Sequence, residues 1–207
     1  VLGIPHNGNL SNGMMFAFSN FAGAPMTADY AQKRQYWEPL TEIVQAKGES
    51  ESHPSLSPND EFADFGKQGW DVGNLDLSAL KTDGMYAAEY AREALKRGLL
   101  MEEKLGVNPF KFGMVGAGDL HTGLSTSEEG NYLGETFILE PSAKRASQVE
   151  KRGEIRRFGH QSLSAGLAAV WARENTRESL FDAMRRREVY ATTGTRMQVR
   201  IFGGWDF

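Results

Sequence analysis

The sequence predicts an α/β fold, built either on a parallel sheet or on part of a β/α barrel. Short apolar segments of strand length alternate with segments whose apolar residues recur every three or four positions, as in sheets covered by helices. The chain has 207 residues, of which 40% are hydrophobic and 24% are charged. That composition is sufficient to bury the core of one domain, so we expect residues 1–207 to form a single α/β domain.

The first third of the chain contains strand, helix, strand and loop signals. Val1–Ile4 is a short apolar strand that ends at Pro5. A helix is expected over residues 28–36, and β-branched residues predict a second strand over 41–46, before a Lys-Gly stop. Residues 49–73 are rich in Ser, Pro, Asn, Asp and Gly and predict a long loop, a kind that is often functional.

The rest of the chain continues the alternation. Apolar residues at helical spacing predict a helix within 77–105, and the apolar run 112–117 predicts a buried strand. Residues 166–172 favour another strand, although their alanines would suit a helix equally well. An Asn-x-x-Glu capping box opens a predicted helix over 175–187, and the alternating segment 197–202 predicts a final strand.

Composition excludes several functional classes. The absence of cysteine rules out disulfides, thiolate zinc sites, iron–sulfur clusters and cysteine nucleophiles. A formal net charge of −4 is unsuited to general binding of nucleic acids or anionic membranes. No apolar run approaches the roughly 20 residues of a membrane span. We therefore expect neither nucleic acid nor a membrane as a partner.

The charges are unevenly distributed along the chain. Residues 1–140 hold 10 basic and 20 acidic side chains, whereas residues 141–207 hold 13 basic and 7 acidic ones. The change coincides with a basic insertion at 142–164. This insertion is either a flexible surface segment or a basic lip over an anionic substrate.

An Asp-x-His pair follows the strand predicted at 112–117. In both candidate architectures, chemistry gathers at the carboxyl ends of the strands, where Asp119 and His121 would lie on one face. A carboxylate and an imidazole can share a divalent cation such as zinc, manganese or iron. A hydrogen-bonded Asp–His couple without metal is the alternative. His6 also follows a strand, either as a third ligand or as part of a simple turn.

A hydroxyl-rich loop, residues 190–196, joins the last predicted helix to the last strand. Its three threonines, its glycine and Arg196 could hold an anion, or they could form a plain connecting loop. The sequence contains no G-x-G-x-x-G, no P-loop, no H-E-x-x-H and no G-x-S-x-G motif. Dinucleotide, P-loop nucleotide, zincin and serine-hydrolase functions are therefore unsupported.

Four ordered segments, at residues 4–9, 38–51, 118–123 and 174–196, resemble an uncharacterised bacterial branch of the PHP (polymerase and histidinol phosphatase) superfamily of metal-dependent phosphoesterases. The resemblance implies a distorted, TIM-related β/α barrel with a cluster of divalent metal ions (zinc, manganese or iron). It identifies His6, Asp119 and His121 as metal ligands.

One departure from that superfamily concerns the start of the chain. PHP enzymes carry an early His-x-His, whereas none of the four histidines here are two residues apart. Because the sequence also opens directly on a strand, we expect it to be the carboxyl-terminal portion of a larger barrel, lacking the amino-terminal strands. The site would then be only half a site unless another chain completes it.

The function implied by the resemblance is metal-dependent hydrolysis of a small phosphorylated substrate. In that role Asn7, Lys47 and Arg196 would contact the anionic substrate. The chain could be inactive by itself if missing strands supply essential ligands. The alternative is a non-catalytic module that binds a sugar or another polar ligand. A homo-oligomer that covers the open barrel edge is a further expectation, while periplasmic and cytoplasmic locations both stay open.

Overall fold

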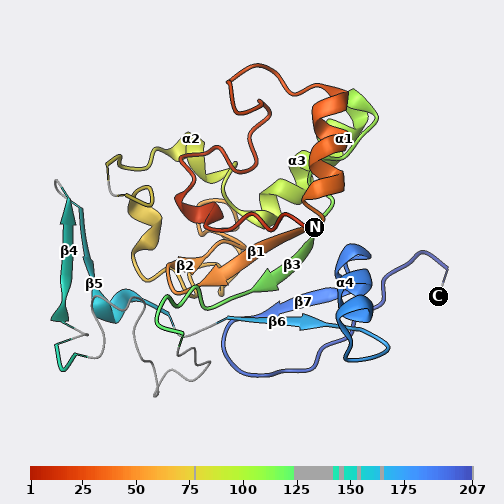
Figure 1. The fold of residues 1–207 in the computed structure, drawn as a ribbon. Helices are drawn as coiled ribbons and strands as arrows, with labels where there is room; N and C mark the ends of the chain where they lie inside the picture. Colours follow the sequence, from red (N-terminus) through yellow and green to blue (C-terminus); the bar gives the residue numbers. More distant parts are fainter. Residues whose placement is uncertain (77, 124–141, 145–146, 153–154, 164–165, 207) are drawn as a thin grey trace.

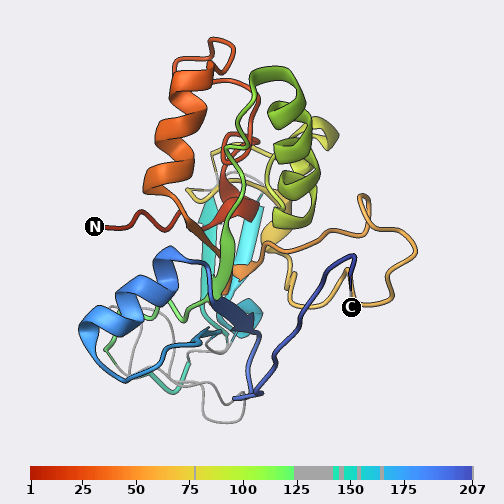
Figure 2. The ribbon, with the colours of Figure 1, turned by 90° about the vertical axis from the view of Figure 1, so that its right-hand side faces the viewer.

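The computed structural model is a mixed α/β structure in which small sheets lie between two groups of helices (Figure 1). Helices α1 (Ala28–Trp37) and α3 (Ala91–Leu105) lie side by side at one end, and α4 (Arg177–Arg185) lies at the other (Figure 2). The described strands form no closed barrel. The structure describes residues 1–76, 78–123, 142–144, 147–152, 155–163 and 166–206.

Helices α1 and α3 enclose the main apolar core. The side chain of Thr27 caps α1 by accepting the backbone N–H of Tyr30 at 3.3 Å. Helix α3 ends at Gly106, whose φ of 72° is the left-handed conformation that favours glycine at this position. The buried residues of this core come from both helices and from the loops around them: Phe16, Met26, Ala31, Ala94, Met101 and Phe110.

The helix expected within 77–105 is interrupted. A short helix, α2 (Asp83–Tyr86), precedes α3, and Tyr90 between them is extended, with φ −104° and ψ 134°. Glu89 and Tyr90 are both fully buried, and the N–H of Ala91 donates to the carbonyl of Ser50 at 2.8 Å. The extended backbone of Tyr90 separates the two helices, so these contacts override the periodicity.

The central sheet confirms two of the expected strands. Strand β1 (Leu40–Gln45) pairs in parallel with β3 (Gly113–Gly116), and a tight hairpin joins β1 to the antiparallel strand β2 (Gly48–Glu49). All six residues of β1 are buried, as is usual for a strand in the middle of a parallel sheet.

A second pair of strands packs against β3. Strands β6 (Leu167–Val170) and β7 (Val189–Thr192) are antiparallel to one another. A Cβ on Gly113 would meet the Val189 side chain, and one on Gly116 would meet the Thr192 carbonyl, so β7 runs in the same direction as β3. The carboxyl ends of β1, β3 and β7 therefore lie at one end of the sheets (Figure 1).

Two predicted strands at the ends of the chain are not strands in the structure. Residues 1–4 form no ladder, and the contacts of this segment are isolated: the N–H of Gly3 donates to the carbonyl of Trp37 at the end of α1, and the N–H of Glu42 in β1 donates to the carbonyl of Pro5. Residues 197–202 form no ladder. Instead, Tyr190 Oη donates to the carbonyl of Met197 at 2.7 Å, so side chains hold this segment.

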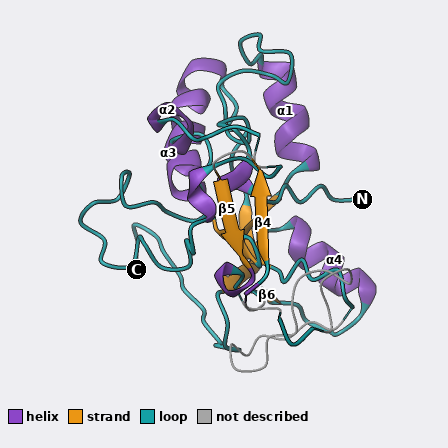
Figure 3. Cartoon of the chain, turned by 90° about the vertical axis from the view of Figure 1, so that its left-hand side faces the viewer, coloured by secondary structure: helices purple, strands orange, loops and turns teal. Residues whose placement is uncertain are grey.

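The basic insertion at 142–164 contains a hairpin of its own. Strands β4 (Val149–Arg152) and β5 (Ile155–Phe158) pair in antiparallel fashion at one side of the molecule (Figure 3), where Arg157 donates to the carbonyls of Asn74 and Leu75 in the loop between β2 and α2. Residues 145–146, 153–154 and 164 of the insertion lie outside the described residues. The helix expected over 175–187 is confirmed as α4, although Thr176 rather than Asn175 caps it.

Candidate functional site

Polar side chains gather where β1 and β3 end. Gln45 closes β1 and Lys47 follows it, while Asp119 comes just after the end of β3. The backbone brings the two segments together, because the N–H of Ala46 donates to the Gly118 carbonyl at 3.1 Å. Asp119 itself has a φ of 52°, an uncommon left-handed conformation that directs its side chain back over the strand ends. We call Glu42, Gln45, Lys47, Asp119 and His121 the strand-end cluster.

The Asp119 carboxylate is the centre of this cluster. Its Oδ2 accepts from Gln45 Nε2 at 3.0 Å and from the Lys47 ammonium at 2.5 Å, and its Oδ1 lies 3.2 Å from His121 Nε2. Burial by itself would raise the pKa of Asp119, but the hydrogen bond and charge of Lys47, helped by Gln45, outweigh it. The net effect lowers the pKa of Asp119, so this side chain is an anion near neutral pH.

Glu42 is a second carboxyl in the same place, and the sequence analysis did not select it. Burial raises its pKa to about 7, although the backbone N–H of Asn7 opposes the shift; the nearby charge of Asp119 adds to it. Glu42 therefore faces both the Asn7 segment and Asp119. The available signal was an ionisable residue within the strand predicted over 41–46, because an ionisable side chain that a strand buries is a functional candidate.

The predicted metal ligands are only partly brought together. Asp119 and His121 are in contact, whereas His6 is exposed on the segment beside β1. Among the described residues, no group of three or more His, Cys, Asp or Glu side chains is arranged to hold a metal ion. The structure thus brings two of the three predicted ligands together, and the metal-binding role of all three stays a prediction.

The predicted substrate-binding residues have different surroundings. Asn7 is buried with a φ of 58°, and its Oδ1 has no hydrogen-bond partner among the residues described. Lys47 is held against Asp119, so its charge is already partly neutralised. Arg196 is exposed in the loop that follows β7, at the same end of the sheets as Asp119.

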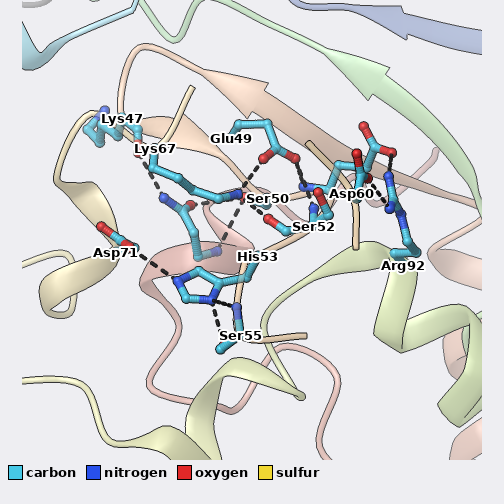
Figure 4. Close-up of polar contacts among 12 residues, drawn as sticks. Lys47, Glu49, Ser50, Ser52, His53, Ser55, Asp60, Lys67, Asp71 and Arg92 are labelled. Carbon is cyan, nitrogen blue, oxygen red and sulfur yellow. Dashed lines mark hydrogen bonds and ion pairs between the residues drawn. The ribbon is translucent and has the colours of Figure 1, made fainter. Parts of the chain in front are cut away.

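A second polar cluster holds the long loop beside this site (Figure 4). The Lys67 ammonium lies 2.5 Å from Glu49 Oε2, and both side chains are almost fully buried. His53 was expected at the surface, yet it is buried between Ser55 and Asp71, with Nδ1 2.7 Å from Ser55 Oγ and Nε2 3.2 Å from Asp71 Oδ2. The loop is therefore fixed by internal contacts.

Comparison with protein families gives one match. The family described as "Protein of unknown function (DUF3604)" matches residues 1–207. The chain belongs to the DUF3604 family. No curated protein and no solved structure matches this DUF3604 chain.

The family description assigns no activity to DUF3604, so the site must be interpreted from its geometry. The strand-end cluster combines a carboxylate, an imidazole and an ammonium group with a carboxyl group whose pKa is near neutrality. Such a set can bind a cation, exchange a proton and attract an anion. No helix in the described part of this DUF3604 chain is both long and apolar enough to cross a membrane.

Proposed function

We propose that this DUF3604 chain is part of a metal-dependent hydrolase with a PHP-like β/α barrel, acting on a small phosphorylated molecule at the strand-end cluster. The observation that carries the proposal is the contact between Asp119 Oδ1 and His121 Nε2 beside the buried carboxyl of Glu42. The shared direction of β1, β3 and β7, with their carboxyl ends together, supports a barrel-like origin of the site.

The separation of the two ligand atoms suits a divalent ion. Oxygen and nitrogen ligands about 2.1 Å from an ion lie about 3.0 Å apart at octahedral angles and about 3.4 Å apart at tetrahedral ones. Asp119 Oδ1 and His121 Nε2 are 3.2 Å apart. A zinc, manganese or iron ion held there would polarise a phosphoryl oxygen and lower the pKa of a coordinated water. His6 would need to approach this pair to act as the third ligand.

Glu42 is suited to move a proton in this reaction. A pKa of about 7 means that both protonation states are populated near neutral pH, which is what a general acid or base requires. The backbone N–H of Asn7 keeps one side of the carboxyl hydrogen-bonded, and burial keeps it apart from bulk water. Glu42 would accept a proton from the attacking water or return one to the leaving group.

The cations near the site would attract the substrate. Lys47 lies within the cluster, and the exposed Arg196 lies in the loop at the end of β7, where its guanidinium can make a bidentate contact with a phosphate group. Asn7 is buried, so its Oδ1 would have to become exposed before it could accept a hydrogen bond from a hydroxyl of the substrate.

Metal affinity tests the proposal directly. Titration calorimetry with Mn²⁺ is expected to show a site in the wild-type chain, and Asp119→Ala is expected to weaken it at least about 10-fold because a charged ligand is lost. Asp29→Ala is the matched control, since Asp29 is an exposed carboxylate on α1 that is paired only with Lys33 among the described residues. Equal affinities in all three proteins, or no binding to the wild type, would refute a metal centre here.

Hydrolysis of p-nitrophenyl phosphate tests the reaction class. The rate with Mn²⁺ should fall in Asp119→Ala and stay unchanged in Asp29→Ala. Arg196→Ala is expected to raise KM more than it lowers kcat, because Arg196 would bind the phosphate without taking part in the chemistry. Metal binding without any hydrolysis by the chain would leave the metal centre standing and reject phosphoester hydrolysis by this chain alone.

A non-catalytic module for a polar ligand is the second candidate. The ion pair between Lys47 and Asp119 favours it, because this carboxylate is already neutralised without any metal. A binding module should be stabilised against heat by a sugar or a sugar phosphate even in the presence of EDTA. Stabilisation that EDTA abolishes would instead favour the metal-dependent enzyme.

A further inference from the structure

Three side chains of the long loop beside the strand-end cluster form a hydrogen-bonded series. His53 lies in the middle: its Nδ1 is 2.7 Å from Ser55 Oγ, and its Nε2 is 3.2 Å from Asp71 Oδ2 (Figure 4). Ser55 is exposed, whereas His53 is buried. A hydroxyl, an imidazole and a carboxylate are thus connected in that order, with the hydroxyl at the surface. The proposed phosphoester hydrolysis uses none of these three side chains.

The backbone decides which nitrogen of His53 carries the proton. The N–H of Ser55 donates to Nδ1 at 3.2 Å, and an N–H can only donate, so Nδ1 must be an acceptor. The proton of the neutral ring is therefore on Nε2, which donates it to Asp71. With Nδ1 unprotonated, the Ser55 hydroxyl donates to it as well. In this arrangement an imidazole can take the proton of a serine nucleophile.

A turn and a stacked ring hold His53 and Ser55 together. The carbonyl of His53 accepts the N–H groups of Leu56 and Ser57, both at 2.9 Å. This turn brings the Ser55 hydroxyl to the imidazole. The ring of Tyr86 is stacked on that of His53, with the centroids 4.1 Å apart and the planes 20° from parallel. The imidazole is therefore oriented from its face as well as from its edges.

Asp71 is held in place by its own neighbours. It lies in the short helix η2 (Trp70–Val72), where Trp70 Nε1 donates to the carbonyl of Gln161 at 2.8 Å. The hydrogen bond with His53 lowers the pKa of Asp71, although burial opposes the shift. The carboxylate therefore stays charged near neutral pH, and its charge would stabilise an imidazolium.

We propose that Ser55 is the nucleophile of a second activity, the hydrolysis of carboxylic esters, in which His53 is the general base and Asp71 is a positioning residue. The G-x-S-x-G motif is absent from the chain, but a Ser-His-Asp set is defined by its geometry rather than by its sequence context. Here Nδ1 faces the serine and Nε2 faces the carboxylate. Either ring nitrogen can take up a proton while the other donates one.

The reaction proceeds in two balanced halves. Ser55 Oγ bonds to the carbonyl carbon of the ester as its proton passes to His53 Nδ1; the bond from that carbon to the alcohol oxygen then breaks, and the leaving oxygen takes the proton. Water next attacks the acyl-serine and gives a proton to Nδ1, and Oγ recovers that proton as its bond to the acyl carbon breaks. The net change converts an ester and water into an acid and an alcohol. Protonation of Nδ1 also frees the N–H of Ser55 to donate to the oxyanion.

The charges around the series favour an uncharged substrate. Asp71 is negative, and Lys67, whose charge acts on Asp71, is already paired with Glu49. A phosphoester dianion would be repelled by Asp71, whereas a neutral ester would not. This activity is therefore independent of the one proposed for the strand-end cluster, and its chemistry requires no metal.

Labelling with a fluorophosphonate–rhodamine probe in the presence of EDTA tests the nucleophile. The wild type is expected to be labelled at Ser55, as located by peptide mass spectrometry, and Ser55→Ala is expected to lose this label. Ser57→Ala is the matched control, because Ser57 is a partly exposed serine in the same turn, and it should be labelled as the wild type is. A folded wild type without label at Ser55 would overturn the proposal.

Hydrolysis of p-nitrophenyl acetate in EDTA tests the reaction. Turnover is expected in the wild type and in Ser57→Ala and is expected to be lost in Ser55→Ala. Label at Ser55 without any turnover would reject ester hydrolysis. Because EDTA is present throughout, neither result depends on whether the strand-end cluster binds a metal.

The roles of His53 and Asp71 need separate measurements. Asp71→Asn keeps the shape of the side chain and removes its charge, so the rate of labelling at Ser55 is expected to fall at least about 10-fold. An unchanged rate would reject the positioning role. The nitrogen chemical shifts of His53 in the wild type do not depend on how a variant folds. An N–H on Nε2 of the neutral ring supports the proposal, and an N–H on Nδ1 overturns it.

Discussion

The buried carboxyl group of Glu42 lowers the stability of the fold but could serve a function. It lies in a strand whose six residues are all buried, and burial raises its pKa to about 7. A buried carboxylate without a full set of partners destabilises the folded state, so a residue of this kind is usually explained by what it does. The negative charge of Asp119 raises the pKa of Glu42, whereas the positive charge of Lys47 lowers it. Near neutral pH, Glu42 therefore populates both protonation states.

Glu42→Gln is expected to stabilise the protein at pH 8 and to have little effect below about pH 4.5. The folded-state pKa lies above the unfolded value of 4.5, so the folded protein binds the proton more tightly. Ionisation therefore removes stability as the pH rises through this window, by up to about 3 kcal/mol for a shift of this size. Glutamine does not ionise and escapes this loss.

Urea unfolding in the presence of EDTA at pH 4.5, 6 and 8 measures the difference in the free energy of unfolding between Glu42→Gln and the wild type. Exposed Glu103 on α3 provides the control, and Glu103→Gln should show no such dependence on pH. A constant difference between Glu42→Gln and wild type across the three pH values would contradict a raised pKa for Glu42. In the metal-loaded protein, the same substitution should lower kcat if Glu42 moves the proton.

Among the structural elements, the long loop between β2 and α2 is held in place by buried ion pairs. Lys67 pairs with Glu49, and Lys81 pairs with Glu89 at 2.8 Å, with all four side chains at most 5% exposed. Burial raises the pKa of Glu49 and lowers that of Lys67, while their mutual attraction opposes both shifts. The Lys67–Glu49 pair holds the loop in one conformation, although the loop contains few strands or helices of its own.

Lys67→Met is expected to destabilise the protein by about 3 kcal/mol, because Glu49 would be left buried without its counter-charge. The double variant Lys67→Met/Glu49→Gln should recover part of this loss. Lys33→Met is the control: Lys33 and Asp29 form an exposed pair, worth no more than about 1 kcal/mol. Urea unfolding at pH 7 measures all four proteins, and equal effects of the two lysine substitutions would contradict a buried pair.

The accuracy of the sequence analysis differed between elements for physical reasons. Local signals located β1, β3 and α4, namely β-branched residues, an apolar run and a capping sequence, because local composition and burial favour the same structure there. Periodicity failed at 87–90, where contacts with Ser50 and the burial of Glu89 interrupt the helix. It failed again at 197–202, where alternation alone does not provide a neighbouring strand to pair with.

The candidate site could likewise be predicted from the sequence only in part. Asp119 and His121 were paired on the expectation of strand alternation, and they are in contact, but β3 ends at Gly116 and the left-handed backbone of Asp119, with a φ of 52°, belongs to the turn that follows. Glu42 and Gln45 could not be joined to them, because β1 and β3 are about 70 residues apart in sequence and only the parallel register brings them together. The burial of His53 likewise depends on distant contacts, with Asp71 and Tyr86.

At the scale of the whole molecule, two glycines of β3 allow the sheets to join. The β6–β7 pair approaches β3 so closely that a Cβ on Gly116 would lie 2.9 Å from backbone atoms of both Leu167 and Thr192. Backbone cannot move aside as a flexible side chain does. The position of the Arg196 loop, which follows β7 at the same end of the sheets as Asp119, thus depends on the absence of a side chain at position 116.

Gly116→Ala is therefore expected to destabilise the protein by about 2 kcal/mol and to loosen the β6–β7 pair from β3. Hydrogen exchange should speed up at the amides of Leu167–Val170 more than within α3. Gly84→Ala is the control, because a Cβ there meets nothing within 4 Å and alanine favours the helix. If both variants kept wild-type exchange in β6, the two sheets would not depend on this close approach. Faster exchange in β6 of Gly116→Ala but not of Gly84→Ala would confirm that the two sheets depend on the close approach at Gly116.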